Sequence, residues 1–407
     1  MRLKMHTGSG RRHHGEPGMS LIEVIIILAV LATLIALLVP STVQQLTAAR
    51  RDGTLDEMED LEKAMTGDPD LIAQGVRTDV GYLGDMGSLP ASLDDLVVQG
   101  AQPAFGFDST MKVGAGWKGP YFTLGPGSDP SSHERDAFGN DYVYDDTDYV
   151  NGDGQEVDAV LVSLGSDALS GGTGVDEDVA VEILKAETAA TVNGYATDAT
   201  DTPLVNAEVS IHYPSDGTLT SDTATTDANG FYQFTDIPFG IRSVEFEPKL
   251  LLVPGSVATF GGSNQNVRFS VVNYADSSVT VRSVTATYTT TAFYNDARWG
   301  AVDVYNCAGV PAGSGGTLTL SADQTVAASP TAPPTAQVAV ASSVVQAVDI
   351  TVEGTGTQAT VELRIFRTGG GSCGSGTLVN MQGTTFTDLT LRDPGNNIVA
   401  QFSFTVP

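Results

Sequence analysis

One carboxylate stands alone inside a long apolar stretch near the start of this chain. Residues 19–39 contain Glu23 as their single charged side chain. An ionised carboxylate in hydrocarbon is costly unless it is paired. The stretch itself offers no cation to pair with Glu23, so the position of this one charge needs an explanation.

A second set of carboxylates gathers further along the chain. Residues 129–187 contain 16 acidic residues against two basic ones, and the segment 162–179 places Asp167, Asp176 and Asp178 among several glycines. Glycines allow backbone carbonyls to turn inward, and a bound divalent cation would relieve the repulsion between the carboxylates. A solvated acidic loop would have a similar composition, so both interpretations stay open at this point.

The chain has two cysteines, Cys307 and Cys373, both in its last third. One pair fits one disulfide in an oxidising compartment, and two unpaired thiols are the alternative. If the chain leaves the cytoplasm, the disulfide is the favoured interpretation, and its role would be to hold a β-domain together.

Residues for catalysis are scarce. Beyond residue 18 the histidines are His133 and His212, which fall in different predicted domains and leave little for a Ser-His or His-metal site. The sequence contains no P-loop and no dinucleotide-binding fingerprint. We therefore expect that the protein is not an enzyme.

The charge of the chain excludes one class of partner. The formal net charge is −29, and the dense positive cluster lies before the apolar stretch, at Arg2, Lys4, Arg11 and Arg12. A polyanion of this kind repels nucleic acid and anionic lipid head groups. We therefore expect no nucleic-acid partner and a soluble, exposed surface for the bulk of the chain.

The apolar stretch must be the element that positions Glu23. Its 21 residues, Met19 to Val39, make a helix about 31 Å long, which is enough to cross a hydrocarbon core. The small residue Gly18 precedes the stretch, whereas a cleaved secretory signal ends in small residues. The basic flank favours a cytoplasmic N-terminus, with everything after Pro40 on the far side of the membrane.

The string G-M-S-L-I-E-V at residues 18–24, behind a short basic leader, resembles the processing site of type IV pilins and type II secretion pseudopilins. The resemblance implies that a prepilin peptidase removes residues 1–18, cuts between Gly18 and Met19, and methylates the new N-terminus. The α-amino cation of a neighbouring subunit would then pair with Glu23 and set the register of a filament. The alternative is an ordinary signal anchor with a stray glutamate.

The helix is expected to continue as an amphipathic segment over residues 40–66, because apolar residues recur there at three-to-four spacing up to Gly67-Asp68-Pro69. The region 67–187 resembles the globular domain of the major, G-type pseudopilin of type II secretion. The strings that carry this resemblance are G-D-M-G-S-L-P at 84–90, W-K-G-P-Y at 117–121 and D-A-F-G-N-D-Y-V-Y at 136–144.

The segment 162–179 is similar to the calcium loop of the same family. The resemblance implies one structural calcium ion, held by the backbone carbonyl of Leu164 and by the carboxylates of Asp167, Asp176 and Asp178. Ala168 stands where the family has a glycine.

The C-terminal half is rich in Thr, Val, Ser and Gly. Residues 188–249 resemble the carboxypeptidase-regulatory-like β-sandwich, with alternating strands and a D-x-N-G turn at 227–230. Residues 250–407 read as an immunoglobulin-like sandwich. Its expected strands are 266–273, 278–290, 302–306, 336–342, 347–353, 359–367 and 398–406.

The predicted fold class is therefore α+β: a long N-terminal pilin helix over 19–66, a small pseudopilin-type α/β head, and two all-β sandwich domains. The predicted function is that of a structural subunit that polymerises through its N-terminal helix into a pseudopilus of type II secretion. The alternative is a surface type IV-like pilin whose outer sandwiches are adhesive.

The expected partners follow from the same resemblance. They are copies of the chain itself, the prepilin peptidase, the inner-membrane assembly platform, minor pilins and exported proteins. The expected location is the inner membrane before assembly, and then a periplasmic or cell-surface filament of a Gram-negative bacterium.

Overall fold

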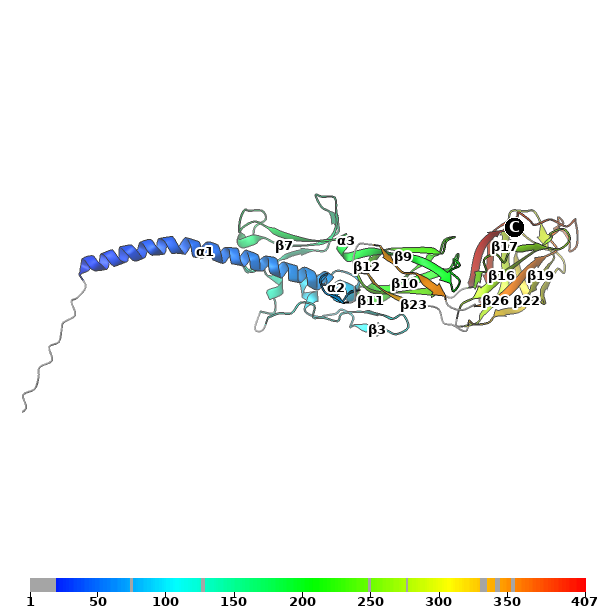
Figure 1. The fold of residues 1–407 in the computed structure, drawn as a ribbon, viewed down its shortest axis with the longest axis horizontal. Coiled ribbons are helices and arrows are strands. Elements are labelled where there is room, and N and C mark those ends of the chain that lie inside the picture. Colours follow the sequence, from blue (N-terminus) through cyan, green and yellow to red (C-terminus); the bar gives the residue numbers. More distant parts are fainter. Residues whose placement is uncertain are drawn as a thin grey trace, which may run out of the picture. The chain divides into compact units, whose positions relative to one another are not determined.

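A computed structural model describes most of the chain (Figure 1). The described residues are 20–73, 76–125, 129–247, 250–275, 277–329, 335–340, 345–352 and 356–407, without the side chains of residues 35–43 and 247. The predicted cleavage site, Gly18 and Met19, lies outside them. The chain divides into two compact units: unit 1 holds residues 1–57, 135–142 and 163–179, and unit 2 holds residues 58–134, 143–162 and 180–407.

Helix α1 spans Leu21–Thr66 and continues through Pro40 and Gly53, two residue types that disfavour helix interiors (Figure 1). It ends at Gly67, whose φ of +85° is left-handed and whose added Cβ would collide with the backbone of Asp79. Among the described residues, no helix has both the length and the apolarity needed to cross a membrane. The predicted membrane-spanning stretch includes Met19 and the side chains of 35–39, which lie outside the described part.

The end of α1 has a clear core-facing side within unit 2. Met58, Leu61 and Met65 are fully buried there. Their three-to-four spacing agrees with the amphipathic pattern predicted for residues 40–66, but Leu46 and Leu55 of the same pattern are exposed. The short elements that follow α1 in the chain are β1 (Ile72–Ala73), β2 (Val76–Arg77), α2 (Gly81–Met86), η1 (Leu93–Leu96), β3 (Gly106–Asp108), β4 (Val113–Ala115) and η2 (Ser132–Glu134).

A small antiparallel sheet completes the predicted head region. Its order is β5 (Val143–Asp145), β7 (Glu156–Ser163), β6 (Tyr149–Val150), with β8 (Val179–Leu184) also paired to β7. Burial alternates strictly along β7, with Val157, Ala159 and Leu161 inside, because successive side chains of a strand point to opposite faces. Two short helices, η3 (Gly165–Asp167) and α3 (Lys185–Thr188), flank β8 in the sequence.

The first sandwich begins directly after α3. One sheet has the order β11-β10-β13-β23, and the other consists of β12, β9 and the short strands β24 and β25. Its core includes the fully buried Val192, Val209, Ile211 and Phe246. The strands are β9 (Ala189–Asp198), β10 (Glu208–Ser215), β11 (Thr218–Thr225), β12 (Phe231–Pro238), β13 (Gly240–Glu247), β23 (Thr335–Val340), β24 (Gln346–Ala347) and β25 (Ile350–Val352).

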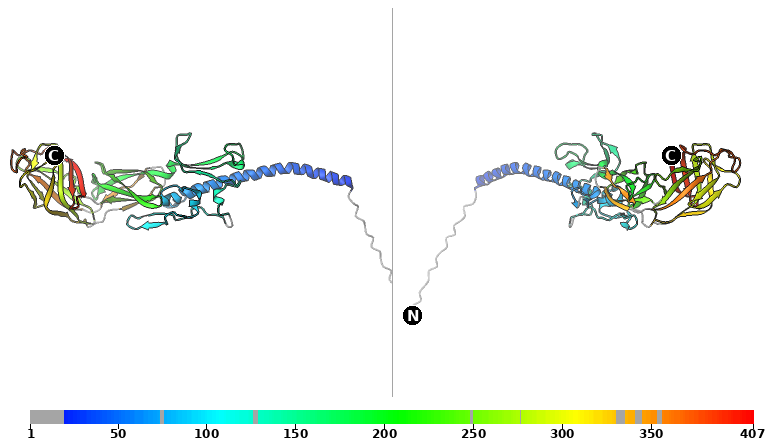
Figure 2. Two further views of the ribbon diagram at one scale, coloured as in Figure 1. Left: turned by 180° about the vertical axis from the view of Figure 1, so that it is seen from behind. Right: turned by 45° about the vertical axis from the view of Figure 1, so that its right-hand side comes forward.

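Three of these strands come from a part of the sequence that was expected to form the C-terminal sandwich. β23 pairs antiparallel with β13, and β24 and β25 pair in parallel with β9. In Figure 1 and in the right-hand view of Figure 2, these orange strands lie among the green strands of the first sandwich. Gly194 permits this approach, because a Cβ at that position would stand 1.8 Å from the carbonyl oxygen of Val348.

The second sandwich is built from the remaining strands. One sheet has the order β14-β16-β26-β19-β20, with β15 also on β16, and the other has the order β22-β17-β27-β28. The bounds are β14 (Leu250–Leu252), β15 (Ala258–Phe260), β16 (Asn266–Asn273), β17 (Val279–Tyr288), β18 (Phe293–Tyr294), β19 (Asp296–Trp299), β20 (Val302–Asn306), β21 (Ala312–Gly313), β22 (Thr317–Val326), β26 (Thr357–Arg364), β27 (Thr385–Arg392) and β28 (Ile398–Thr405).

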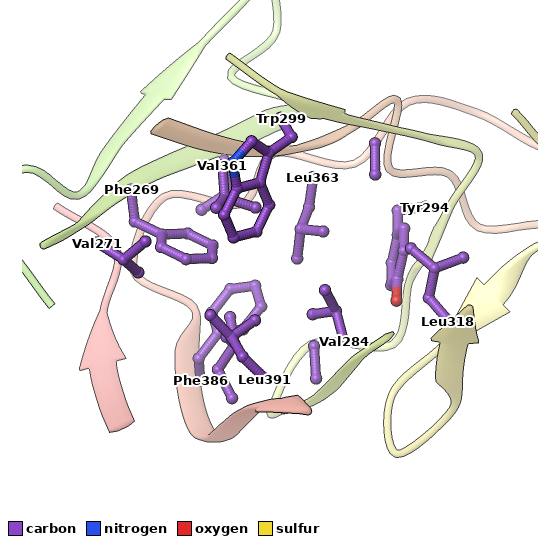
Figure 3. Close-up of a cluster of buried hydrophobic side chains, with 14 of the residues drawn as sticks. Phe269, Val271, Val284, Tyr294, Trp299, Leu318, Val361, Leu363, Phe386 and Leu391 are labelled. Atoms are coloured by element: carbon purple, nitrogen blue, oxygen red, sulfur yellow. The ribbon is translucent and has the colours of Figure 1, made fainter. Parts of the chain in front are cut away.

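Side chains from both sheets meet in one core (Figure 3). Phe269 of β16 and Trp299 of β19 come from the first sheet, and Val284 of β17 and Phe386 of β27 come from the second. The rings of Phe269 and Phe402 lie edge to face, with centroids 5.7 Å apart, which is a favoured aromatic arrangement. The core accounts for why the alternating strands of this region fold as a sandwich.

Within unit 2, α2 is docked onto the first sandwich through a buried arginine. Arg242 of β13 is fully buried and donates to the carbonyl oxygens of Pro238 (2.9 Å), Gly84 (3.0 Å) and Phe239. The backbone N–H of Gly217 donates to the carbonyl of Met86 at 2.8 Å. Burial lowers the pKa of the guanidinium, and the Asp85 carboxylate raises it. We call these contacts the α2 joint.

Candidate functional site

Glu23 closes the start of helix α1. Its Oε2 accepts hydrogen bonds from the backbone N–H (3.0 Å) and the hydroxyl (3.3 Å) of Ser20, and the Ser20 hydroxyl accepts from the N–H of Glu23 at 3.3 Å. This reciprocal pattern is a capping box, and the spacing S-L-I-E was its signal in the sequence. Sequence reasoning assigned Glu23 to a neighbouring subunit and missed this local partner.

Glu23 stands among exposed apolar side chains. Leu21 and Ile22 are 79% and 66% exposed. A chain that presents such a surface needs lipid or other protein surfaces to cover it. The capping box therefore describes the surroundings of Glu23 among the described residues of the single chain.

The predicted calcium loop lies between β7 and β8 and folds back on itself in unit 1. The backbone N–H of Ser166 donates to the carbonyl of Val175 at 2.9 Å, and that of Asp178 donates to Gly171 at 3.3 Å. Gly172 allows this close return, because a Cβ there would stand 2.2 Å from the carbonyl oxygen of Asp176. Ala168 adopts the left-handed conformation, with φ of +56°, where the resembled family has glycine.

The three predicted carboxylate ligands are each oriented by the loop. Asp167 Oδ1 accepts from the N–H of Leu169 at 3.0 Å, Asp176 Oδ1 accepts from the hydroxyl of Ser166, and Asp178 Oδ2 accepts from the N–H of Gly171 at 2.9 Å. The other oxygen of Asp178, Oδ1, is buried and has no hydrogen-bond partner within the described part of the chain. Leu164 precedes η3 at the same turn.

An unpaired, buried carboxylate oxygen in a loop of turned carbonyls fits a hard cation such as calcium. The side chains alone do not form a compact cage. Among the described residues, the group of three or more acidic or histidine side chains with ligand atoms within 4.8 Å of one another is Asp94, His133 and Glu134. A calcium ion in the loop would therefore need backbone carbonyls as well as the predicted carboxylates.

Arg51 of α1 holds the loop against the helix. Its Nη1 donates to the carbonyl oxygens of Gly174 (2.8 Å) and Glu177 (3.1 Å), and its Nη2 lies 3.3 Å from the Glu177 carboxylate. The arginine is 28% exposed. Sequence reasoning missed it, because an arginine on a polar helix face carries no local sign of a partner more than 120 positions away.

The segment around Asp136 also contacts the beginning of the loop. Asp136 Oδ1 accepts from the N–H groups of Phe138 (3.0 Å) and Asn140 (2.9 Å), and its Oδ2 accepts from the hydroxyl of Ser163 at 2.6 Å. The Asn140 amide donates to the carbonyl of Gly165 at 2.7 Å. The motif at 136–144 therefore also holds the beginning of the acidic loop in place.

The same segment is tied to α1. The N–H of Ala137 donates to the hydroxyl of Thr54 at 3.2 Å, and the hydroxyl of Tyr142 donates to the carboxylate of Glu57 at 3.2 Å. Burial, and then the nearby Glu57 carboxylate, raises the pKa of Tyr142 above its ordinary value. The tyrosine therefore stays protonated and acts as a donor at physiological pH.

The two cysteines are brought together in the second sandwich. Cys307, directly after β20, is joined to Cys373 with the sulfurs 2.02 Å and the Cα atoms 5.7 Å apart. The N–H of Cys307 donates to the carbonyl of Asn295 at 2.9 Å. The bridge closes a loop of 66 residues, so it constrains the unfolded chain over a long span.

Comparisons with known proteins agree with two parts of this description. Residues 191–249 match the family model of the carboxypeptidase regulatory-like domain, which confirms the resemblance predicted for the first sandwich. The chain is also similar to the type II secretion system core protein G of Xanthomonas campestris pathovar campestris. The two are 29% identical over 169 residues, which cover 40% of this chain and 89% of that protein.

Two solved structures show weaker likenesses. A carbohydrate-binding candidate from Pseudomonas aeruginosa is 16% identical, with 40% of this chain and 88% of that chain covered and a TM-score of 0.14. The major pilin SpaD of Corynebacterium diphtheriae is 10% identical, with 54% and 64% covered and a TM-score of 0.20. At these TM-scores neither structure carries an argument about this chain.

Proposed function

We propose that this protein is a pilin-like structural subunit that polymerises through its N-terminal helix into a pseudopilus, and that the pseudopilus belongs to a type II secretion system. One observation carries the proposal: the similarity to a secretion core protein G spans 89% of that protein. The motif at 18–24 and the exposed apolar start of α1 support it.

The proposed assembly begins with processing in the inner membrane. A prepilin peptidase cuts between Gly18 and Met19 and methylates the new N-terminus, and the assembly platform then draws the subunit into a filament. Glu23 changes partner in this step. Its carboxylate leaves the Ser20 cap and pairs with the α-amino cation of a neighbouring Met19, which satisfies a charge that lipid or protein would otherwise bury unpaired.

A calcium ion is proposed to complete the acidic loop. The orphaned Oδ1 of Asp178, the carboxylates of Asp167 and Asp176 and the carbonyl of Leu164 are the groups that would hold it. The ion would supply only charge neutralisation and geometry. Its role is structural, since it would stabilise the segment that Arg51 holds against α1.

Glu23 offers a sharp test, because two substitutions separate its two roles. Glu23→Gln keeps a side chain that serves in a capping box but removes the charge, whereas Glu23→Leu removes both. We expect both variants to be processed normally and both to lose most filament assembly. Filaments of Glu23→Gln in normal amounts would contradict the charge-pairing account, and a loss confined to Glu23→Leu would assign the effect to the helix cap.

A surface pilus with adhesive outer sandwiches is the second candidate function. It is favoured by the extent of the two sandwiches, which have their own cores and a disulfide and which the similarity to protein G, at 40% of this chain, does not account for. The deciding experiment is to shear cells and image the released fraction by electron microscopy, with antibody against residues 250–407. Processed chain confined to the envelope supports the secretion pseudopilus, and fibres labelled along their length support the surface pilus.

A further inference from the structure

Three side chains of metal-binding type converge in unit 2, on residues that the acidic loop and the α1 cap do not use. Asp94 lies on η1, and His133 and Glu134 lie on η2. Their ligand atoms all lie within 4.8 Å of one another, and His133 Nε2 is 2.9 Å from Asp94 Oδ1. The sequence separation of about 40 positions explains why the sequence alone left little for a histidine-metal site.

The helical turn that carries Asp94 is held by its neighbour. Asp95 Oδ2 accepts from the backbone N–H of Ser92 at 3.1 Å, and its Oδ1 accepts from the Gln102 amide at 2.9 Å. The indole N–H of Trp117 donates to the Asp95 carbonyl at 2.8 Å. The Asp95 carboxylate is thus already hydrogen-bonded within and beside η1. Asp94 is the carboxylate of this turn that faces His133.

The second turn is fixed in the same way. Asp129 Oδ1 accepts from the N–H (3.1 Å) and hydroxyl (3.0 Å) of Ser131, and the Asp129 carbonyl accepts from the N–H of Ser132 at 3.0 Å. His133 follows directly and is 1% exposed. Both short helices are therefore positioned by contacts that do not involve the three converging side chains.

The burial of the three residues differs in a way that suits a metal ion. The imidazole of His133 is buried and its Nε2 faces Asp94, whereas the Asp94 side chain is 64% exposed. A buried nitrogen ligand gives a fixed anchor, and exposed carboxylates can rotate toward an ion and leave room for water ligands. His212 pairs with Glu245 at 3.2 Å in a similar way, but it belongs to no described group of three.

We propose that Asp94, His133 and Glu134 form a binding site for a divalent transition metal, of which Zn²⁺ is the best fit. Ligand atoms about 2.0–2.2 Å from a tetrahedral zinc ion lie roughly 3.3 Å apart, so the cluster must contract by about 1.5 Å at most. The imidazole nitrogen favours such a metal over calcium, which prefers oxygen ligands. The bound ion ties η1 to η2.

Titration calorimetry with ZnCl₂ tests this site in the full chain, held in detergent and saturated with calcium. All proteins carry His6, His13 and His14 replaced by Asn, because histidines in the leader would bind zinc on their own. We expect the reference protein to bind one zinc ion. Loss of a group that merely supports a metal ligand lowers metal affinity about 10- to 100-fold, so His133→Gln should lower the zinc affinity by at least that factor. The matched control His212→Gln should leave the zinc affinity unchanged.

A second variant guards against a folding defect. If His133→Gln lowers the melting temperature without zinc, the test relies on Glu134→Gln instead. The Glu134 side chain is partly exposed, so this substitution should lower the affinity for zinc and leave the melting temperature unchanged. Equal zinc affinity in the reference protein and Glu134→Gln overturns the proposal. The proposal is also overturned if the reference protein binds zinc without calcium but not when it is saturated with calcium, since that would mark general binding to the acidic surface. Neither result bears on filament assembly.

Discussion

Two arginines each hold one region of this protein by donating hydrogen bonds to backbone carbonyls. The two regions differ in whether their buried polar groups all have partners. Arg51 donates to the carbonyls of Gly174 and Glu177 in the acidic loop, and Arg242 donates to those of Gly84 and Phe239 in the α2 joint. Arg51 is 28% exposed, and Arg242 is fully buried. The loop keeps an orphaned carboxylate oxygen, Asp178 Oδ1, whereas the joint supplies acceptors for its own cation.

The difference shows where each region must find its stability. The α2 joint is completed by hydrogen bonds and apolar packing within the chain, since Leu83 of α2 belongs to the core of the first sandwich. The acidic loop gathers several like charges, and Arg51 pairs with Glu177 among them. The Asp178 Oδ1 atom is left without a partner within the described part of the chain. The stability of the α2 joint should therefore change on substitution but not with calcium, whereas the stability of the acidic loop should change with both.

Arg242→Met is expected to have the largest effect. It leaves several buried carbonyls without their donor, at about 1–1.5 kcal/mol each, for a total of about 4 kcal/mol. Amide hydrogen exchange of α2 is the measurement, and this loss corresponds to about 10³-fold faster exchange of its protected N–H groups. The effect should be the same in calcium and in chelator.

The matched control for this change is Arg282→Met in the second sandwich. Arg282 pairs with Asp323 at 2.7 Å, but both side chains are more than 40% exposed, so we expect a change below about 1 kcal/mol. Equal and small effects at both positions would mean that the α2 joint is held by packing and that Arg242 is dispensable.

Asp178→Asn should have an intermediate effect that depends on calcium. Binding of an ion at 100 times its dissociation constant stabilises the bound state by about 2.7 kcal/mol, and we expect this variant to lose about 2 kcal/mol of that. In chelator the loss should vanish, because removal of one carboxylate also removes repulsion. Hydrogen exchange of the residues 165–178 measures both conditions.

Asp153→Asn serves as the comparison for the loop. Asp153 is an exposed acid in the turn before β7, and Asp153→Asn removes one negative charge from the chain, as Asp178→Asn does. Similar responses of the two variants to calcium would assign the effect to general charge screening, and the specific loop site would then be wrong.

The smallest effect concerns the pH dependence of the α2 joint. Burial raises the pKa of Asp85 above its ordinary value of 3.8, and Lys118, Tyr121 and Arg242 oppose the shift. An acid that holds its proton more tightly when folded adds stability below its unfolded pKa, and this is lost as the pH rises through the folded pKa. We expect α2 protection to fall from about pH 4 upward in the unaltered chain and to stay flatter in Asp85→Asn, with a difference below about 1 kcal/mol. A steeper fall in Asp85→Asn would contradict the assigned direction.

The local patterns were readable from the sequence. The spacing of Met58, Leu61 and Met65 predicted the buried side of α1, and alternation predicted the strand at 266–273, which is β16. Strands β22 and β27 were missed, because polar residues interrupt the apolar alternation in both. Short apolar signals are weak where threonine and aspartate fill the exposed positions.

The contacts between distant segments were not readable. Arg51 and Arg242 are polar residues on a helix and a strand, and their partners are carbonyls, which every residue possesses. The strands at 336–342 and 347–353 were expected in the second sandwich, whereas β23, β24 and β25 belong to the first. Alternation identifies a strand and its buried face, but the choice of sheet depends on sites such as Gly194, which admits a close neighbour.

The return of β23–β25 to the first sandwich interleaves the two sandwiches along the chain. The order is first sandwich, second sandwich, first again, and second again, with the last passage beginning after Val352. No single cut in the gene separates them: a stop codon after residue 249 would strip β13 of its neighbour β23 and β9 of its two parallel partners. A stop codon after Val352 would keep every strand of the first sandwich but leave β14–β22 without β26, β27 and β28, so a single truncation cannot remove one whole sandwich and leave the other complete.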